Sequence, residues 1–261
     1  MCGTSKPLAI DLYCGLGGWT EGLLAEGYRV VGFDNERHAY GDQAYPAQLV
    51  LQDVLTIHGR QLKDAALIVA SPPCQEYSYM AMPWSIAKQK ARDYESGKLD
   101  VKQLTALFDA CFRIQCEASE AKGEHIPLVV ENVRGAQKWV GRSRWNFGSF
   151  HLWGDVPALM PMTLKAIGRR TAVGTGARFC SREDGRKATR GGKDGWFGDY
   201  QAMKDGIKQH GSGREWFAGD GRISRLTSSK SPARKAASAM IAKIPLVLSR
   251  HIAKSWHPAN A

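Results

Sequence analysis

The sequence lacks several features that would indicate a membrane, secreted or metal-binding protein. It contains no run of eighteen apolar residues, so we expect no membrane-spanning helix. Its first residues contain no apolar segment of the kind found in secretory signal peptides, so we do not expect secretion. The six cysteines include no C-x-x-C pair, which argues against a structural zinc site and a disulfide framework. These absences favour a protein of the reducing cytoplasm that binds no metal ion.

Acidic residues are too few in one segment to balance its basic residues. The formal net charge is +11, and residues 165–235 contain 17 Lys or Arg against 7 Asp or Glu. The remainder contains 19 against 18. The segment also holds 13 of the 28 glycines and aromatic residues that include Trp196 and Trp216. Basic loops interleaved with aromatic rings suit a nucleic acid, and a merely solubilising surface is the alternative.

The chain opens with a predicted strand, a glycine-rich turn and a helix. Residues 8–13 are a compact apolar segment, residues 14–18 contain three glycines, and residues 19–26 have helical spacing. Such a turn lets a nucleotide-like ligand approach the bare backbone, and the helix N-terminus offers amide groups. The glycines match G-x-G-x-x-G only loosely, so a simple tight turn is the alternative.

Two acidic residues follow the next predicted strands. Asp34 ends a strand predicted over residues 28–33 and follows the glycine turn by about twenty residues, where such folds place the acceptor for ribose hydroxyls. Asp53 follows a third apolar segment, residues 49–51, and would reach the same ligand. A helix N-cap or an ordinary turn residue is the alternative for Asp53.

Cys74 is the candidate nucleophile. Residues 65–70 predict a buried parallel strand, and Pro72 and Pro73 force the chain to turn at its carboxyl end. The turn places Cys74 at the edge of the predicted sheet where open α/β sheets bind their ligands. A thiol held there can act as a nucleophile. A buried cysteine that packs as a small hydrophobic group is the alternative.

Glu131 is the second candidate reactive group. It follows residues 126–130, which predict another buried strand, and should emerge on the same edge as Cys74. Residues 76–100, which follow the Cys74 motif, form a long connection without clear periodicity. Such a connection is typical of a lid over an active site.

A helix is predicted over residues 101–121. Its apolar stripe includes Cys111 and Cys116, so we expect both of these thiols to be structural.

Three motifs, in the same order and at similar spacing, resemble those of the DNA (cytosine-5) methyltransferases. Residues 11–18 (DLYCGLGG) are similar to the family's first motif, which binds S-adenosylmethionine. Residues 73–78 (PCQEYS) fit its P-C-Q-x-[FY]-S nucleophile motif, and residues 131–133 fit its E-N-V motif. Their order and spacing agree over residues 8–154. Residues 150–155 (FHLWGD) and the small size resemble compact phage-encoded members.

The resemblance implies an α/β, Rossmann-like fold of S-adenosylmethionine-dependent methyltransferases, with a small irregular basic target-recognition segment. We expect residues 1–155 to form the catalytic and cofactor-binding domain, and residues 156–230 to form the target-recognition region. Residues 231–261 are expected to contain a helix that packs back on the catalytic domain, broken or kinked at Pro245.

The resemblance also implies roles for individual residues. Tyr13 would stack on the cofactor adenine, Asp34 would hold its ribose, and Asp53 would meet the adenine amino group. The other expected cofactor-binding residues lie in or near the motifs: Asp11, Gly15, Gly17, Gly18, Asn35 and Pro72. The expected nucleic-acid contacts come from the nucleophile motif and the basic segment: Gln75, Ser78, Arg169, Arg170, Arg186 and Lys187.

The implied reaction transfers a methyl group from S-adenosylmethionine to C5 of a cytosine flipped out of double-stranded DNA. Cys74 would add to C6, and Glu131 would donate a proton to N3, with a pKa raised by a partly desolvated cleft. The family's Q-x-R-x-R element is absent, and either Arg142 or Arg144 is expected to take the place of its arginine. Its G-N-S-V motif is also absent, and residues 241–245 occupy that position.

Three alternatives compete with this interpretation. A tRNA cytosine-5 methyltransferase would share the catalytic residues, and the basic segment favours duplex DNA only modestly. A catalytically inactive DNA-binding regulatory protein would not need Cys74, Glu131 and Asp34 together. An amino-methyltransferase with a D-P-P-Y motif needs an aromatic residue where Cys74 stands. We expect a monomer in a bacterial or phage-infected host cell, in a phage or restriction–modification setting.

Overall fold

The computed structural model describes residues 6–40, 43–75, 77, 84–160, 235–236, 239–240 and 242–260 of the 261-residue chain. The chain divides into two compact units, Met1–Pro157 with Lys243–Ala261, and Ala158–Ala242. All strands and helices with described bounds belong to the first unit.

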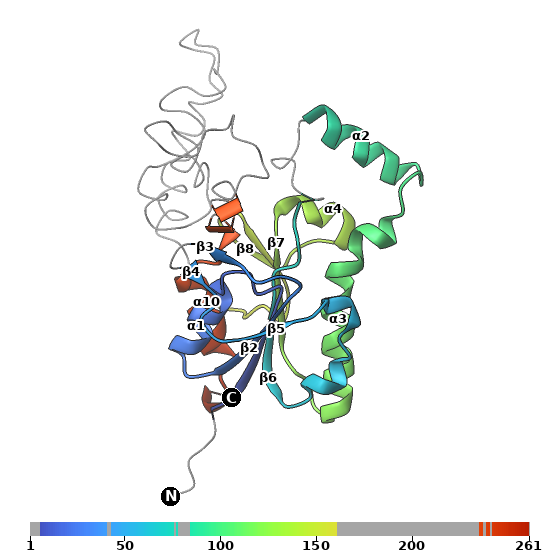
Figure 1. Ribbon diagram of the computed structural model, residues 1–261. Coiled ribbons are helices and arrows are strands. Elements are labelled where there is room, and N and C mark those ends of the chain that lie inside the picture. Colours follow the sequence, from blue (N-terminus) through green and yellow to red (C-terminus); the bar gives the residue numbers. More distant parts are fainter. Residues whose placement is uncertain are drawn as a thin grey trace, which may run out of the picture. The chain divides into compact units, whose positions relative to one another are not determined.

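Seven strands form one mostly parallel sheet in the order β5-β2-β1-β6-β7-β9-β8 (Figure 1). Five neighbours run parallel: β5 (Gln48–Leu51), β2 (Arg29–Asp34), β1 (Leu8–Leu12), β6 (Ala65–Ala70) and β7 (Leu128–Asn132). A hairpin of β8 (Trp145–Phe147) and β9 (Phe150–Gly154) completes the sheet, with β9 antiparallel to β7. A separate short hairpin joins β3 (Ala39–Tyr40) to β4 (Gln43–Ala44). The expected α/β, Rossmann-like fold is confirmed.

The central strands are continuously apolar because helices cover both faces of the sheet. Every residue of β7 is buried, and in β6 only Ala66 is partly exposed. Helix α3 (Val101–Lys122) covers one face, while α1 (Gly18–Ala25) and α10 (Leu246–Ser255) pack together on the other (Figure 1). A strand buried on both faces shows no alternation of polar and apolar residues, so the uninterrupted apolar segments predicted these strands correctly.

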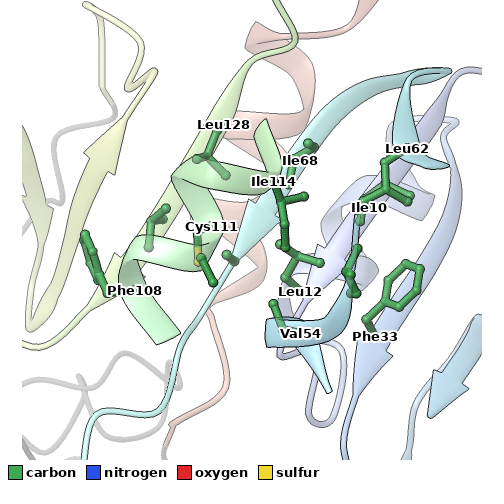
Figure 2. Close-up of a cluster of buried hydrophobic side chains, with 14 of the residues drawn as sticks. Ile10, Leu12, Phe33, Val54, Leu62, Ile68, Phe108, Cys111, Ile114 and Leu128 are labelled. Carbon is green, nitrogen blue, oxygen red and sulfur yellow. The ribbon is translucent and has the colours of Figure 1, made fainter. Parts of the chain in front are cut away.

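One stripe of α3 fills the core against the sheet. Phe108, Cys111 and Ile114 lie on this stripe, and Ile68 and Leu128 of β6 and β7 lie opposite (Figure 2). Fully burying one large apolar side chain stabilises the fold by roughly 1.5–3 kcal/mol. The stripe therefore holds α3 beneath the strands that carry the candidate catalytic residues.

The connection over residues 76–100 differs from the sequence prediction, because it contains a helix, α2 (Trp84–Glu95). Among the described side chains of α2 only Ala87 is buried, so the segment shows no apolar stripe. Its last turn is held by other contacts. Tyr94 packs edge-on against Trp139, with ring centroids 5.4 Å apart, and Glu95 Oε1 lies 2.6 Å from Lys138 Nζ.

The expectation that both cysteines of α3 are structural is wrong for Cys116. Cys111 is fully buried, whereas Cys116 is exposed. Residues five apart are separated by about 140° around an α-helix, so the two thiols cannot share one stripe.

Pro245 stands directly before α10, which begins at Leu246, as a proline break predicts. The helix expected before Pro245 lies largely outside the described residues. Within the described ranges, no helix is long and apolar enough to cross a bilayer. The same residues contain no group of three or more His, Cys, Asp or Glu side chains arranged to hold a metal ion.

Candidate active site

The candidate site lies at the carboxyl edge of the five parallel strands. Tyr13 follows β1, Asp34 ends β2, and Asp53 follows β5. Cys74 lies in the loop after β6, and Glu131 is the fourth residue of β7. Because these strands are parallel neighbours, their carboxyl ends open on one edge of the sheet. The fold therefore gathers the candidate residues of all five strands along one rim.

Left-handed backbone conformations shape the turn after β1. Gly15 and Gly17 have φ angles of 51° and 78°, and the non-glycine residue Tyr13 has a φ of 58°. A side chain is unfavourable in this region, so the hydrogen bond from Tyr13 Oη to the Leu107 carbonyl oxygen, at 2.8 Å, helps to hold it. A Cβ atom built on Gly15 would meet nothing within 4 Å, so the turn borders open space.

Asp34 joins the glycine turn to the end of β2. It is 8% exposed, and its carboxylate accepts hydrogen bonds from the amides of Gly15 at 2.9 Å and Asn35 at 2.8 Å. Burial opposes ionisation, but hydrogen bonds from His38 and Gly15 and the charge of His38 outweigh it and lower the pKa of Asp34. An ionised carboxylate therefore stands at the rim of the site.

Asp53 is a helix N-cap, which was the alternative to a role in ligand binding. It is exposed and caps the short 3-10 helix Val54–Thr56, where its Oδ1 accepts the Leu55 amide hydrogen at 2.9 Å. A carboxylate has two oxygens, so this cap leaves acceptor capacity at the end of β5.

Asp11 lies beneath the glycine turn, away from solvent. It is 0% exposed, and its Oδ2 accepts the Thr20 hydroxyl at 2.7 Å. The Tyr45 hydroxyl lies 2.7 Å from Thr20 Oγ1 and extends this chain of contacts. Asp11 Oδ1 has no hydrogen-bond partner among the described residues. Burial raises the pKa of Asp11 to about 8, partly offset by the hydrogen bond from Thr20.

We expect Asp11→Asn to stabilise the protein more at pH 8 than at pH 5. Because the pKa of Asp11 is raised in the folded state, the folded carboxyl stays protonated while the unfolded one ionises above its ordinary pKa of 3.8. The contribution of Asp11 to wild-type stability therefore falls as pH rises toward 8, by at most about 1.4 kcal/mol per pH unit. Asparagine does not titrate. Thermal unfolding at both pH values measures the difference, with exposed Asp64→Asn as the control. A pH-independent difference would contradict a buried, protonated Asp11.

The Cys74 loop is tied to both neighbouring elements. Trp19 Nε1 of α1 donates to Ser71 Oγ at 2.9 Å, and Asn132 Nδ2 of β7 donates to the Pro72 carbonyl oxygen at 2.9 Å. Cys74 itself is partly exposed. No separate role was predicted for Asn132 from the sequence, although a buried amide at the end of an apolar strand needs hydrogen-bond partners and could have indicated one.

Glu131 lies within β7, the buried strand whose last residue contacts the Cys74 loop. It is 9% exposed, and its neighbour Asn132 makes the hydrogen bond to that loop. Val130 packs in the core beneath α3, so strand alternation places Glu131 on the opposite face. The thiol loop and the carboxyl group are thus connected through adjacent residues of one rigid strand.

A cavity of about 180 Å³ lies beside the Cys74 loop. Its lining comes from the loop, the end of α2 and the first turns of α3: Pro73, Gln75, Tyr77, Tyr94, Gln103, Leu104, Leu107 and Phe108. Two of these residues, Pro73 and Gln75, flank Cys74 in the sequence. The Tyr77 hydroxyl donates to the Leu104 carbonyl oxygen at 2.7 Å and fixes one wall.

The segment at the position of the absent G-N-S-V motif packs on α1. A Cβ atom on Gly18 would collide with the Ile244 amide nitrogen, and one on Gly22 would collide with Ser249. Lys243 Nζ lies 2.5 Å from Glu21 Oε1. This close approach was not predicted from the sequence, although two glycines four residues apart on a helix could have indicated it.

Of the remaining expected site residues, some are exposed at the surface and others lie outside the described part of the chain. Arg142 and Arg144 are exposed between α4 (Gln137–Val140) and β8, and Gln75 is exposed beside Cys74. Five expected nucleic-acid contacts lie outside the described residues: Ser78, Arg169, Arg170, Arg186 and Lys187.

Known proteins resemble this chain in sequence. A family model described as C-5 cytosine-specific DNA methylase matches residues 8–138. Type II methylase M.HgiDII of Herpetosiphon aurantiacus is 34% identical over 79 residues, which cover 26% of this chain and 22% of that protein. The match therefore spans about a fifth of that relative's length.

Two solved structures are similar at lower identity. The S. pombe Dnmt2 methyltransferase is 12% identical with a TM-score of 0.44, covering 98% of this chain and 100% of that chain. The Entamoeba histolytica methyltransferase EhMeth is 13% identical with a TM-score of 0.34, covering 53% of this chain and 41% of that chain.

Proposed function

Because the chain belongs to the C-5 cytosine-specific DNA methylase family, we propose that it methylates C5 of a flipped cytosine in double-stranded DNA. Membership implies S-adenosylmethionine as the methyl donor. The observation that carries the proposal is the hydrogen bond from Asn132 to the Pro72 carbonyl oxygen, since it joins the Cys74 loop to the strand of Glu131. A nucleophile and a proton donor on one rim are what cytosine C5 chemistry requires.

The residues at the rim fit this cofactor. Gly15 borders open space, and the ionised Asp34 carboxylate ends β2 beside it. We assign the contacts with the adenosine part of the cofactor to Tyr13, Asp34 and Asp53. Contacts to the rest of the cofactor are assigned to the turn and its neighbours: Gly15, Gly17, Gly18, Asn35 and Pro72. Asp11 is buried under the turn, so we assign it to the support of the turn. Bound there, S-adenosylmethionine supplies an electrophilic methyl group.

The chain's own residues would activate the base. The Cys74 thiolate forms the Sγ–C6 bond, the π electrons of C5–C6 move through C4 toward N3, and N3 takes the proton of Glu131. C5 thereby becomes a nucleophilic enamine carbon. Once C5 is methylated, a base removes the C5 proton, the C5–C6 double bond re-forms, and the thiolate leaves. The N3 proton returns to Glu131, so the enzyme is regenerated.

The base would be reached only after it leaves the duplex, because stacking hides both faces of C5 and C6. We assign the lid over the flipped base to residues 76–100, with Gln75 and Ser78 contacting the nucleic acid. We assign target recognition to residues 156–230, with phosphate contacts from Arg169, Arg170, Arg186 and Lys187. The similarity to a type II methylase supports a restriction–modification setting.

Methyl transfer to defined substrates tests the proposal. The protein is incubated with labelled S-adenosylmethionine and either duplex DNA or tRNA, and the modified cytosines are mapped. We expect label at C5 of cytosines within one short duplex sequence. Label in tRNA alone would replace the proposed substrate with RNA. DNA binding without label on either substrate would identify the inactive regulatory protein instead.

We expect Asp34→Asn to weaken the binding of S-adenosylmethionine about 10- to 100-fold, because a hydrogen bond to a charged group contributes about 1.5–3 kcal/mol. Calorimetric titration of the free protein measures the affinity. Asp64→Asn is the matched control, since it is the same substitution at an exposed residue just before β6, at the other edge of the sheet. Equal affinities for wild type and Asp34→Asn would remove Asp34 from the cofactor site.

A further inference from the structure

The short segment from Arg142 to Arg144 holds two exposed arginines on either side of a partly buried serine. The sequence alone leaves open which arginine acts on the base. Ser143 shows how the segment is held. Its Oγ lies 2.9 Å from Nδ1 of His151 in β9, and both its amide and its Oγ lie 3.2 Å from Oε1 of Gln137 in α4. Ser143 thus makes three contacts to two elements.

The two partners of Ser143 are themselves fixed. His151 is 9% exposed and pairs with Asn132 in the register of β9 against β7. Asn132 in turn holds the Cys74 loop through the Pro72 carbonyl oxygen. Burial, and secondarily the charge of Arg134, lower the pKa of His151, so its ring is neutral near pH 7. Ser143 is therefore anchored to the same strand pair that organises the candidate active site.

The strand register places one of the two arginines nearer to Glu131. Leu152 of β9 pairs with Glu131 of β7, and the Leu152 carbonyl oxygen accepts the Arg144 amide hydrogen at 2.8 Å. Neighbouring strands lie about 4.8 Å apart, so the backbones of Arg144 and Glu131 are separated by roughly 10 Å. A pyrimidine ring between an arginine and a glutamate side chain fits such a span. Arg142 has no such register contact among the described residues.

We propose that Ser143 is a positioning residue: held by His151 and Gln137, it fixes Arg144 so that the guanidinium meets the charge that develops on the flipped cytosine opposite Glu131. This inference rests on the proposed function. Preorganised donors stabilise developing charge because they need no reorientation during the reaction, and the rigid, permanently charged fork of arginine suits this task. Glu131 would protonate one edge of the ring while Arg144 meets the neighbouring carbonyl oxygen.

The test is a double-mutant cycle on methyl transfer to duplex DNA. We expect Arg144→Ala to lower kcat about 10²- to 10³-fold, the usual effect of removing one such donor. Ser143→Ala should lower kcat about tenfold, consistent with the loss of a net hydrogen bond. KM for DNA and cofactor, and the melting temperature, should change little. Ser143→Thr, which keeps a hydroxyl, should recover most of the activity.

The combinations identify the arginine that Ser143 positions. Ser143→Ala added to Arg144→Ala should cause no further loss, whereas Ser143→Ala added to Arg142→Ala should multiply the two effects. Full activity of Ser143→Ala, or independent effects of Ser143 and Arg144, would overturn the inference while leaving the methyltransferase proposal intact. Non-additivity with Arg142 alone would overturn the assignment of Arg144. A wild-type protein that methylates no cytosine would overturn the proposed function, and the inference with it.

Discussion

DNA that carries 5-fluorocytosine at the target position should become covalently attached to the protein when S-adenosylmethionine is present, and Cys74→Ser should abolish the attachment. The adduct of Cys74 with C6 normally lasts only until the C5 proton is removed. Fluorine cannot leave C5 as a cation, so methylation leaves the adduct without an exit. A serine hydroxyl is scarcely ionised at neutral pH and is a far weaker nucleophile than a thiolate.

The other described cysteines provide internal controls for this experiment. Burial raises the pKa of the Cys111 thiol, and Cys111→Ala should cost stability through the core while leaving trapping intact. Cys116 is exposed, so Cys116→Ala should change neither stability nor trapping. Mass spectrometry of the trapped species locates the link. Attachment at any other residue, or efficient methylation by Cys74→Ser, would end the covalent mechanism.

Glu131→Gln should lower the single-turnover rate of methylation by about 10²- to 10⁴-fold, the usual effect of removing an acid–base group. The amide has almost the same volume and can still donate a hydrogen bond, but it cannot deliver a proton to N3. Binding of DNA and of S-adenosylmethionine should therefore stay close to that of the wild type. Equilibrium binding and single-turnover rates, measured on the same preparations, separate the two effects.

The control for this substitution is Glu124→Gln, because the Glu124 side chain is 74% exposed in the loop before β7. It should leave both binding and rate unchanged. If the single-turnover rate of Glu131→Gln lies within a few-fold of the wild-type rate, Glu131 does not transfer a proton and only positions the base.

The sequence predicted the strands that carry the site because these strands are buried on both faces. Residues 65–70 match β6 at both ends, and the strand predicted before Glu131 is β7, shifted by two residues. Asp34 was expected at the end of a strand, and it ends β2. In each case the signal is local: a short apolar run, a turn former, and a polar residue after it.

The sequence prediction failed where stability comes from contacts between distant segments. Among its described side chains, helix α2 buries only Ala87, and its last turn contacts Trp139 and Lys138, which no local pattern reveals. The exposure of Cys116 is decided by its angle around α3 relative to the sheet. The contacts of α2 leave no periodic trace along the chain, whereas the position of Cys116 off the buried stripe follows from the helical period and could have been predicted.

By itself, the sequence determined the order of the five parallel strands along the chain, the helices that follow β1 and precede β7, the glycine turn, and the residues that reach the carboxyl edge of these strands. These properties follow from backbone sterics, hydrophobic periodicity and the spacing of a few residue types, all of which act over short stretches of chain. Only the tertiary structure decided which side chains hold one another across the sheet. Asn132 meets the Pro72 carbonyl group and Ser143 meets His151 because the strand order and register bring them within hydrogen-bonding distance, and helix packing brings Gly18 of α1 against the Ile244 backbone.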